Sequence, residues 1–299
     1  MTEADQSKRA DGGLKAGKLA PGLYLAATPI GSSGDVTLRV LDALKRADAI
    51  AAEDTRRALK LMSIHGVARA GRPMIPYHDH NGEAARPGLL ARIEAGESVV
   101  CVTDAGTPLI ADPGWKLAEA AIARGLPVTA LPGASALLAA LSVAGLPTDR
   151  FMFAGFLAPK SAARRADLTT LKAVPATLVF YESARRLGEA LADMAVTLGA
   201  DRRVAVCREL TKLHEEVRRG ELGELAEYYS GPPPKGEIVI CVGPPLHRAA
   251  TAEEIDAALG AALAEMGVRD AAASVSEALG LQRRAVYARA LALSAKDRR

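Results

Sequence analysis

Residues 99–114 read VVCVTDAGTPLIADPG, an apolar run that changes abruptly into a polar, turn-rich segment. The run 99–102 is continuously apolar and mostly β-branched, which is typical of a strand buried on both faces. Asp, Thr, Gly and Pro dominate residues 103–114, and WKLAEAAIARG at 115–125 then shows the apolar spacing of a helix that stops at glycine. The sequence therefore predicts a long loop at the carboxyl end of a parallel strand, where open α/β sheets bind ligands.

Two interpretations of this loop remain open. Small residues let a ligand approach the backbone, and Asp104 and Thr107 offer a few directional hydrogen bonds. An ordinary β-to-α connection uses the same residue types. The length of the loop and its clusters of Pro, Gly and Asp favour a ligand loop.

The N-terminal half alternates apolar runs with helical patterns, which predicts a parallel, doubly wound sheet of five strands. The second strand is expected at 49–52 and the fifth at 127–131. An amphipathic helix is expected over 36–47, behind an Asp35 cap. The turn 132–135 leads directly into another helix, whose free N-terminus would form a second small-residue wall of the same crevice.

The expected domain plan is a disordered lead-in at 1–20, an α/β domain at 21–146 and a second α/β domain at 150–246. The Gly- and Pro-rich segment GLPTDRF lies between the two domains. A helical C-terminal extension is expected at 251–299, with breaks near Gly267 and Gly280. For this extension, an RNA contact of the helix-turn-helix kind and a plain packing appendage both remain open.

Composition narrows the class of protein. Nearly half of the residues (49%) are hydrophobic, enough for a sizeable core, and no apolar run approaches the length of a membrane span. Cys101, Cys207 and Cys241 each sit in a strand-like run without CxxC spacing, which predicts buried thiols in a reduced, cytoplasmic protein. Neither a dinucleotide fingerprint nor a phosphate-binding P-loop is present in the sequence.

The net charge is only +3, so the positive charge is local. Paired arginines are expected on solvated faces, and several pairs on one side would form a phosphate-binding patch. These pairs begin at Arg164, Arg185, Arg202, Arg218 and Arg283.

Charged and imidazole side chains come after two of the predicted strands. Glu53, Asp54 and Arg56 come directly after 49–52, where helix capping and a functional role are equally compatible with the sequence. His78 and His80 have the spacing of a metal pair. Because no further ligands lie nearby in the sequence, polar loop residues facing a substrate are favoured and no metal is predicted.

Several longer strings occur in one order along the chain and extend over nearly all of it beyond the first twenty residues. They are LAATPIGSSGDVTLR, AAEDTR, HDHN, VTDAGTPLIADPG, LPGASA, GLPTDRF, FYESARR, RELTKLHEE and KGEIVICV. Together they closely resemble the ribosomal RNA small subunit methyltransferase I family, which has the tetrapyrrole-methylase fold. Two departures concern Ser32, where the family usually has Asn, and Ala134-Ser135, where Pro-Cys or a similar pair is common.

The resemblance implies a fold of two α/β/α domains with a cofactor cleft between them, a small C-terminal helical appendage, and commonly a homodimer. It implies methyl transfer from S-adenosylmethionine to the ribose 2′-oxygen of a cytidine in the decoding region of 16S rRNA. Carried over by position, the cofactor residues are Asp104, Ala105, Gly106, Thr107, Pro132, Ala134, Ser135, Phe180, Tyr181, Gly236 and Glu237.

The acceptor-facing residues are expected to be Gly31, Asp35, Glu53, Arg56, His78, His80 and Arg185. A ribose hydroxyl is a weak nucleophile, so a base would help the transfer. Asp54, Glu182 or a histidine such as His78 could serve, and the acidic residues are favoured. Direct displacement from a sulfonium needs no metal.

Two rival functions remain. A tetrapyrrole methylase of the same fold usually carries a Gly-Pro-Gly-Asp-Pro turn where this chain has Ala-Gly-Thr-Pro. A non-catalytic RNA-binding assembly factor would have a degraded cofactor cleft, yet the small-residue loops of this chain are intact.

Overall fold

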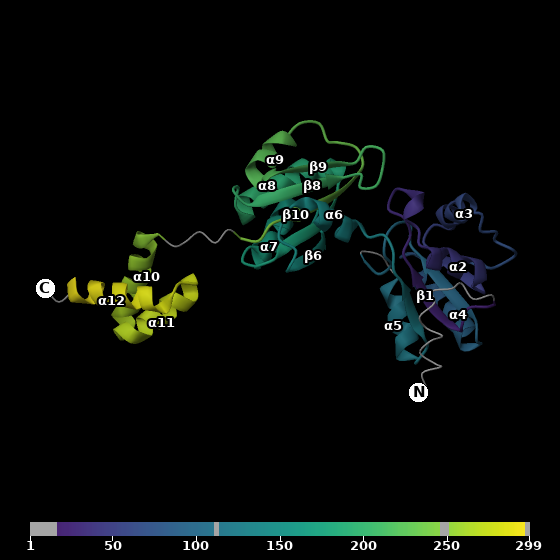
Figure 1. Cartoon of the computed structure of the whole chain (residues 1–299), viewed down its shortest axis with the longest axis horizontal. Coiled ribbons are helices and arrows are strands. Elements are labelled where there is room, and N and C mark those ends of the chain that lie inside the picture. The colour runs from purple at the N-terminus through teal and green to yellow at the C-terminus, as the bar shows by residue number, and fades with distance from the viewer. Residues whose placement is uncertain (1–16, 111–113, 246–250, 297–299) are drawn as a thin grey trace. The chain divides into compact units, whose positions relative to one another are not determined.

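The computed structural model describes residues 17–110, 114–245 and 251–296. Most of the predicted lead-in, together with Asp112 and Pro113 of the long loop, lies outside the described residues. The chain divides into two compact units, one ending at Pro245 and the other beginning at Leu246. The first unit holds two five-stranded sheets, here called the first and second sheets (Figure 1).

The first sheet has the order β3-β2-β4-β1-β5, and all of its strand pairs are parallel. Its strands are β1 (Gly22–Ala26), β2 (Ala49–Ala52), β3 (Met74–Pro76), β4 (Ser98–Val102) and β5 (Val128–Leu131). Every residue of the central strand β4 is buried, as its apolar sequence predicts. The prediction of a parallel five-stranded sheet is confirmed.

Helices cover both faces of the first sheet. The helices α2 (Leu38–Arg46) and α3 (Thr55–Ile64) bury Val40, Leu44 and Met62 against one face. On the other face, α4 (Gly82–Glu94) and α5 (Trp115–Ala123) contribute Leu89, Ile93 and Leu117 to a second cluster. Because successive side chains of a strand point to opposite faces, both faces of the first sheet are apolar and both are covered by helices, which is the doubly wound arrangement.

The second sheet has the order β6-β7-β10-β8-β9, with β6 and β7 parallel and the other pairs antiparallel. Its strands are β6 (Phe151–Phe156), β7 (Thr177–Ser183), β8 (Arg203–Arg208), β9 (Glu216–Glu221) and β10 (Glu237–Val242). One face packs against α7 (Ser161–Leu171), α8 (Leu187–Leu198) and α9 (Leu222–Tyr228).

The other face of the second sheet packs against α6 (Ala136–Ala144), the helix that was expected to complete the first domain. Leu137 and Leu141 of α6 share a buried cluster with Val179 of β7 and Val239 of β10. By packing, the chain therefore passes to the second sheet at the turn 132–135, before the Gly- and Pro-rich segment that the sequence suggested.

One local expectation in the first sheet's connections, the Asp35 cap, was wrong. The helix after β1 begins at Leu38 and is capped by Thr37, whose Oγ1 accepts a hydrogen bond from the N–H of Val40. Asp35 instead belongs to a single 3-10 turn, Ser33–Asp35. The strand β3 ends at Pro76, so His78 and His80 lie in the turn before α4.

The expectation that paired arginines lie on solvated faces was wrong for two of them. Arg164 and Arg202 are each only 1% exposed. The Nε of Arg164 lies 2.7 Å from Oδ2 of the buried Asp193, and Arg202 donates hydrogen bonds to the carbonyl oxygens of Lys172 and Gly243. Burial of each guanidinium is tolerated because carboxylate or backbone oxygens accept hydrogen bonds from it.

The second unit is a bundle of three helices, α10 (Ala252–Glu265), α11 (Val268–Leu279) and α12 (Arg283–Lys296). It has a core of its own, which includes Leu259, Val275 and Val286. The predicted breaks are confirmed, since Gly267 caps the start of α11 and Gly280 ends it in the left-handed region at φ 62°.

The three cysteines are free and buried, as predicted. Among the described helices, none is both long and apolar enough to span a bilayer.

Replacing Asp193 with alanine leaves Arg164 buried without its closest countercharge. We expect the free energy of unfolding of the part of the chain that contains the second sheet to fall by about 3–5 kcal/mol. The matched control is Arg165→Met, which removes the other arginine of Asp193 from a side chain that is 51% exposed. That change should cost less than about 1 kcal/mol. Urea unfolding followed by circular dichroism measures both, and equal losses would contradict the assignment.

Candidate functional site

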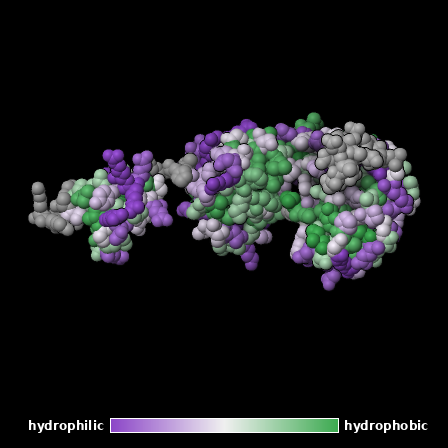
Figure 2. Space-filling model, turned by 60° about the horizontal axis from the view of Figure 1, so that its bottom comes forward, coloured by the Kyte–Doolittle hydropathy of each residue, from purple (hydrophilic) through white to green (hydrophobic). Residues whose placement is uncertain are grey.

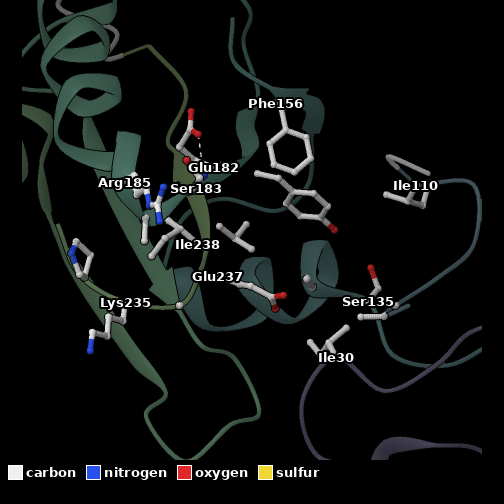
Figure 3. Close-up of a pocket in the computed structure, with 18 of the residues that line it drawn as sticks. Ile30, Ile110, Ser135, Phe156, Glu182, Ser183, Arg185, Lys235, Glu237 and Ile238 are labelled. Carbon is white, nitrogen blue, oxygen red and sulfur yellow. Dashed lines mark hydrogen bonds between the residues drawn. The ribbon is translucent and has the colours of Figure 1, made fainter. Parts of the chain in front are cut away.

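A cavity of about 630 Å³ lies between the carboxyl end of the first sheet and the second sheet. Figure 3 shows Ile30, Ser135, Phe156 and Glu237 around it, contributed by four separate segments of the chain. Its walls are mainly apolar, with a few hydroxyl, carboxylate and cationic groups among them. This is the composition of a small-molecule site rather than of a solvent channel.

The loop after β4 forms one wall through Ala105, Gly106 and Thr107. Gly106 has φ 85°, and its N–H and carbonyl both bond to the backbone of Thr28 at 2.9 Å. The hydroxyl of Thr107 donates to the carbonyl of Ala134 at 3.0 Å. The loop is thus tied both to the extension of β1 and to the turn before α6, and only glycine adopts this conformation at position 106 without strain.

The start of α6 forms the facing wall through Ser135 and Ala136. Ser135 occupies the N-cap position, and its side chain makes no capping bond to the helix. The first N–H groups of a helix lack partners within the helix, so a ligand in the cavity meets hydrogen-bond donors and the positive end of the helix dipole.

Tyr181 supplies an aromatic wall from β7. Its ring packs edge-on against Phe153 and Phe156, with ring centroids 4.8 Å and 5.8 Å apart. Burial raises the pKa of Tyr181, while a hydrogen bond from the N–H of Leu137 opposes that shift. The phenol therefore stays neutral, and its ring position is fixed from two sides.

Glu182 lies beside this wall and is only 3% exposed. Its Oε1 accepts hydrogen bonds from the N–H of Ser183 at 2.7 Å and from Nε of Arg186 at 2.8 Å (Figure 3 shows the bond to Ser183). Its Oε2 is buried and has no hydrogen-bond partner among the described residues. Because side chains alternate along β7, this carboxylate lies on the same face as Phe180, and Glu182 borders the cavity through its position on the strand.

Some predicted cofactor residues do not line the cavity. Phe180 is fully buried in the core against α7–α9, so its assignment as a cofactor residue was wrong. The reason is that successive side chains of β7 point to opposite faces, and Tyr181 takes the cavity side. Pro132 and Ala134 do not line the cavity. The carbonyl of Ala134 accepts a hydrogen bond from Thr107 of the loop, and that of Pro132 accepts one from Thr37, the cap of α2.

Asp104 belongs to a separate carboxylate cluster at the ends of β2 and β4. Its Oδ1 accepts a bond from the N–H of Asp54 at 3.0 Å, and its own N–H donates to Glu53 at 3.1 Å. Asp54 caps α3 by accepting from the N–H of Arg56 at 2.8 Å, so the capping interpretation is confirmed. None of these residues contributes to the cavity walls.

His78 and His80 lie away from this cavity. Their ring centroids are 6.0 Å apart, and His78 borders a second hollow of about 380 Å³ between the starts of α4 and α5, with Trp115 and Arg86. Among the described residues, no group of three or more His, Cys, Asp and Glu is arranged to hold a metal ion.

Arg185, expected on the acceptor side, borders the main cavity, whereas Gly31 and Asp35 do not line it. Sequence reasoning missed several lining residues that come from strand ends and apolar loop positions. They are Ile30, Ile110, Ala136, Phe156, Ser183, Ala184, Pro234, Lys235, Ile238 and Val239. Only the alternation along β7 and β10 could have indicated Ser183 and Val239.

Comparison with known proteins agrees with this architecture. A family model described as Tetrapyrrole (Corrin/Porphyrin) Methylases matches residues 22–226, and one described as RsmI C-terminal HTH domain matches 249–294. Ribosomal RNA small subunit methyltransferase I of Mesorhizobium japonicum is 47% identical over 281 residues, which cover 94% of this chain and 95% of that protein.

The chain belongs to the ribosomal RNA small subunit methyltransferase I family.

A second member of this methyltransferase I family, from Erythrobacter litoralis, is 47% identical over 92% of this chain and 96% of its own length. The solved structure of uroporphyrin-III C-methyl transferase from Thermus thermophilus, complexed with S-adenyl homocysteine, has a TM-score of 0.51 and 22% identity. It covers 74% of this chain and 96% of that chain, and it shares the fold.

The carboxylate of Asp54 provides a test of the cluster beside the cavity. The hydrogen bond and ion pair from Arg56 lower the pKa of Asp54 to about 2. We expect Arg56→Met to raise this pKa toward its ordinary value, as measured by the carboxyl ¹³C shift during a pH titration. Because the folded-state pKa lies below the unfolded one, the stabilising contribution of Asp54 is lost as the pH falls toward 2. Arg69→Met is the control, and an unchanged pKa in Arg56→Met would contradict the pairing.

Proposed function

We propose that this chain transfers a methyl group from S-adenosylmethionine to the ribose 2′-oxygen of a cytidine in the decoding region of 16S rRNA. The substrate is the small ribosomal subunit, and the site of action is the cytoplasm. The observation that carries the proposal is the cavity between the two sheets, in a chain whose relatives named ribosomal RNA small subunit methyltransferase I align along more than nine-tenths of their length.

The cavity is suited to the cofactor. A volume of about 630 Å³ falls within the range of small-molecule sites. Gly106 leaves the backbone of its loop accessible, and the rim carries the carboxylate of Glu237. The complex of a protein with this fold with S-adenyl homocysteine also supports this choice. When bound, S-adenosylmethionine supplies an electrophilic methyl group on a sulfonium sulfur.

The residues of the chain contribute positioning and exclusion of water. Ile30, Phe156 and Tyr181 shield the cavity, while the loop of Gly106 and the start of α6 define its two walls. Holding the reactants in line at near-attack distance supplies much of the rate enhancement without any covalent role for the protein.

Of the two candidate acidic residues, Glu182 borders the cavity and Asp54 does not. The lowered pKa of Asp54 also makes it a poor proton acceptor at neutral pH. The carboxylate of Glu182 lies on the core side of β7, where Ser183 and Arg186 hold one of its oxygens. We therefore assign Asp54 to the support of α3 and Glu182 to the positioning of the cavity wall at the end of β7.

The acceptor RNA approaches along the carboxyl edge of the first sheet. Gly31, Asp35, Glu53, Arg56, His78, His80 and Arg185 are proposed to face it. Recognition of a 2′-hydroxyl selects RNA over DNA, and the target nucleotide must be exposed to reach the cavity. No metal is required for this displacement.

We also propose that the chain acts as a homodimer. The strand β6 is an edge of the second sheet and exposes the large side chains of Phe151, Met152 and Phe156. Figure 2 shows a broad apolar area over this part of the molecule. An apolar edge of this kind is suited to a second copy, which would cover it.

The deciding experiment gives the chain labelled S-adenosylmethionine and small ribosomal subunits from cells that lack this methylation. We expect 2′-O-methylcytidine in the nucleoside digest, with free 16S rRNA as the comparison substrate. Transfer to a tetrapyrrole precursor but not to RNA would favour a small-molecule methylase. Absence of cofactor binding at millimolar concentration would favour a non-catalytic RNA-binding factor.

A pair of glycine variants tests the cofactor wall. Gly106→Ala forces a side chain into a left-handed backbone that lines the cavity, and we expect cofactor affinity to fall about tenfold. Gly96→Ala imposes the same backbone strain at φ 87°, with open space around it and no contact with the cavity. Calorimetry with S-adenosylhomocysteine should find unchanged affinity in the control, and equal losses in both variants would overturn the assignment.

A further inference from the structure

The loop between β8 and β9, residues 209–215, is called here the β8–β9 loop. Two of its residues adopt positive φ although neither is glycine, Glu209 at 53° and Thr211 at 64°. A β-branched residue such as threonine rarely adopts this region, and such strain persists where the surroundings enforce it. The contacts of the loop with its neighbours therefore hold these two residues in place.

The β8–β9 loop is wedged between two glycines from different parts of the first unit. A Cβ added at Gly31 would lie 2.5 Å from both Oγ1 of Thr211 and Cγ of Lys212. A Cβ added at Gly236, where φ is 113°, would collide with the side chain of Glu209. Gly31 belongs to the turn that we assign to the acceptor, and Gly236 lines the cofactor cavity. The loop therefore touches both sides of the proposed reaction.

Lys212 is the charged centre of this contact. Its Nζ lies 2.7 Å from Oε1 of Glu209 and 2.9 Å from Oε2 of Glu237, while the lysine side chain is 27% exposed. The hydrogen bond from Lys212 lowers the pKa of Glu209, so both groups are charged at neutral pH. Glu237 is a lining residue of the cavity, and its carboxylate is 72% exposed.

A second contact reaches the first sheet. The N–H of Ser32 donates a hydrogen bond of 3.1 Å to Oγ1 of Thr211, the residue next to Lys212. Adjacent residues of the loop thus hold the turn Gly31–Ser32 on one side and Glu237 on the other.

We propose that Lys212 is a positioning residue for the methyl transfer. It holds Glu237 at the cavity rim and, through the loop it anchors, places the acceptor-side turn relative to the cofactor. Because the ammonium is paired with two carboxylates and stays charged, it acts through geometry and not as a base. This inference rests on the proposed function, since it needs an acceptor on the Gly31 side.

The test is Lys212→Met in the full chain, assayed with labelled S-adenosylmethionine and small ribosomal subunits. We expect kcat to fall at least about tenfold, toward the ~10²-fold loss typical of an ångström-scale misplacement. Affinity for S-adenosylhomocysteine should stay within about threefold, because the N–H of Glu237 remains bonded to Glu209 at 2.9 Å. Lys212→Arg should recover most of kcat, since it restores the charge between the two carboxylates.

Arg92→Met is the matched control. It also removes one cation from an ion pair, with Glu97 at 2.7 Å, where α4 ends and β4 begins. This variant should keep the wild-type kcat.

Three outcomes overturn the inference. They are full activity in Lys212→Met, a parallel loss of cofactor affinity and melting temperature that marks a structural role, and failure of Lys212→Arg to recover kcat. If the unmodified chain itself transfers no methyl group to subunits, the proposed function fails first and the inference falls with it.

Discussion

Complete burial of β4 is the constraint on which the first sheet and the site depend. A strand with both faces covered can place polar residues only beyond its ends, so the change from Val102 to Thr103 puts the chemistry at the carboxyl edge. Because β1 and β5 run parallel to β4, the loops after them reach the same edge. Three connections therefore meet at this edge because of strand direction alone: the loop of Gly106, the turn of Gly31 and the turn before α6.

The second sheet completes the site through the packing of α6. This helix leaves the edge of the first sheet but buries its apolar face against β7, β8 and β10. Its N-terminus consequently stays at the cavity while its body belongs to the second core. One short helix thus joins the two sheets and places its N-terminus at the space between them.

Close contacts with neighbouring backbone or side chains explain why glycine occurs at three positions in and beside the cavity. Gly106 pairs with Thr28 at a positive φ, whereas Gly31 and Gly236 admit side chains of the β8–β9 loop. In each case a methyl group would either strain the backbone or occupy the space of a neighbour. The contacts at these three positions are therefore steric as much as electrostatic, and the Lys212 ion pairs add charge to an arrangement already restricted by shape.

The sequence by itself determined the parallel first sheet, the long loop after β4 and the three C-terminal helices with their breaks, because hydrophobic period and turn chemistry are local properties. It also indicated much of the cavity wall, including Gly106, Ser135, Tyr181 and Glu237. Tertiary structure alone decided that α6 joins the second sheet, that Arg164 and Arg202 are buried, and that Phe180 faces the core. These outcomes depend on contacts between elements that are distant in the sequence. The same reason hid the role of Lys212, since it depends on contacts with Glu237 and Gly31, which are distant from it in the sequence.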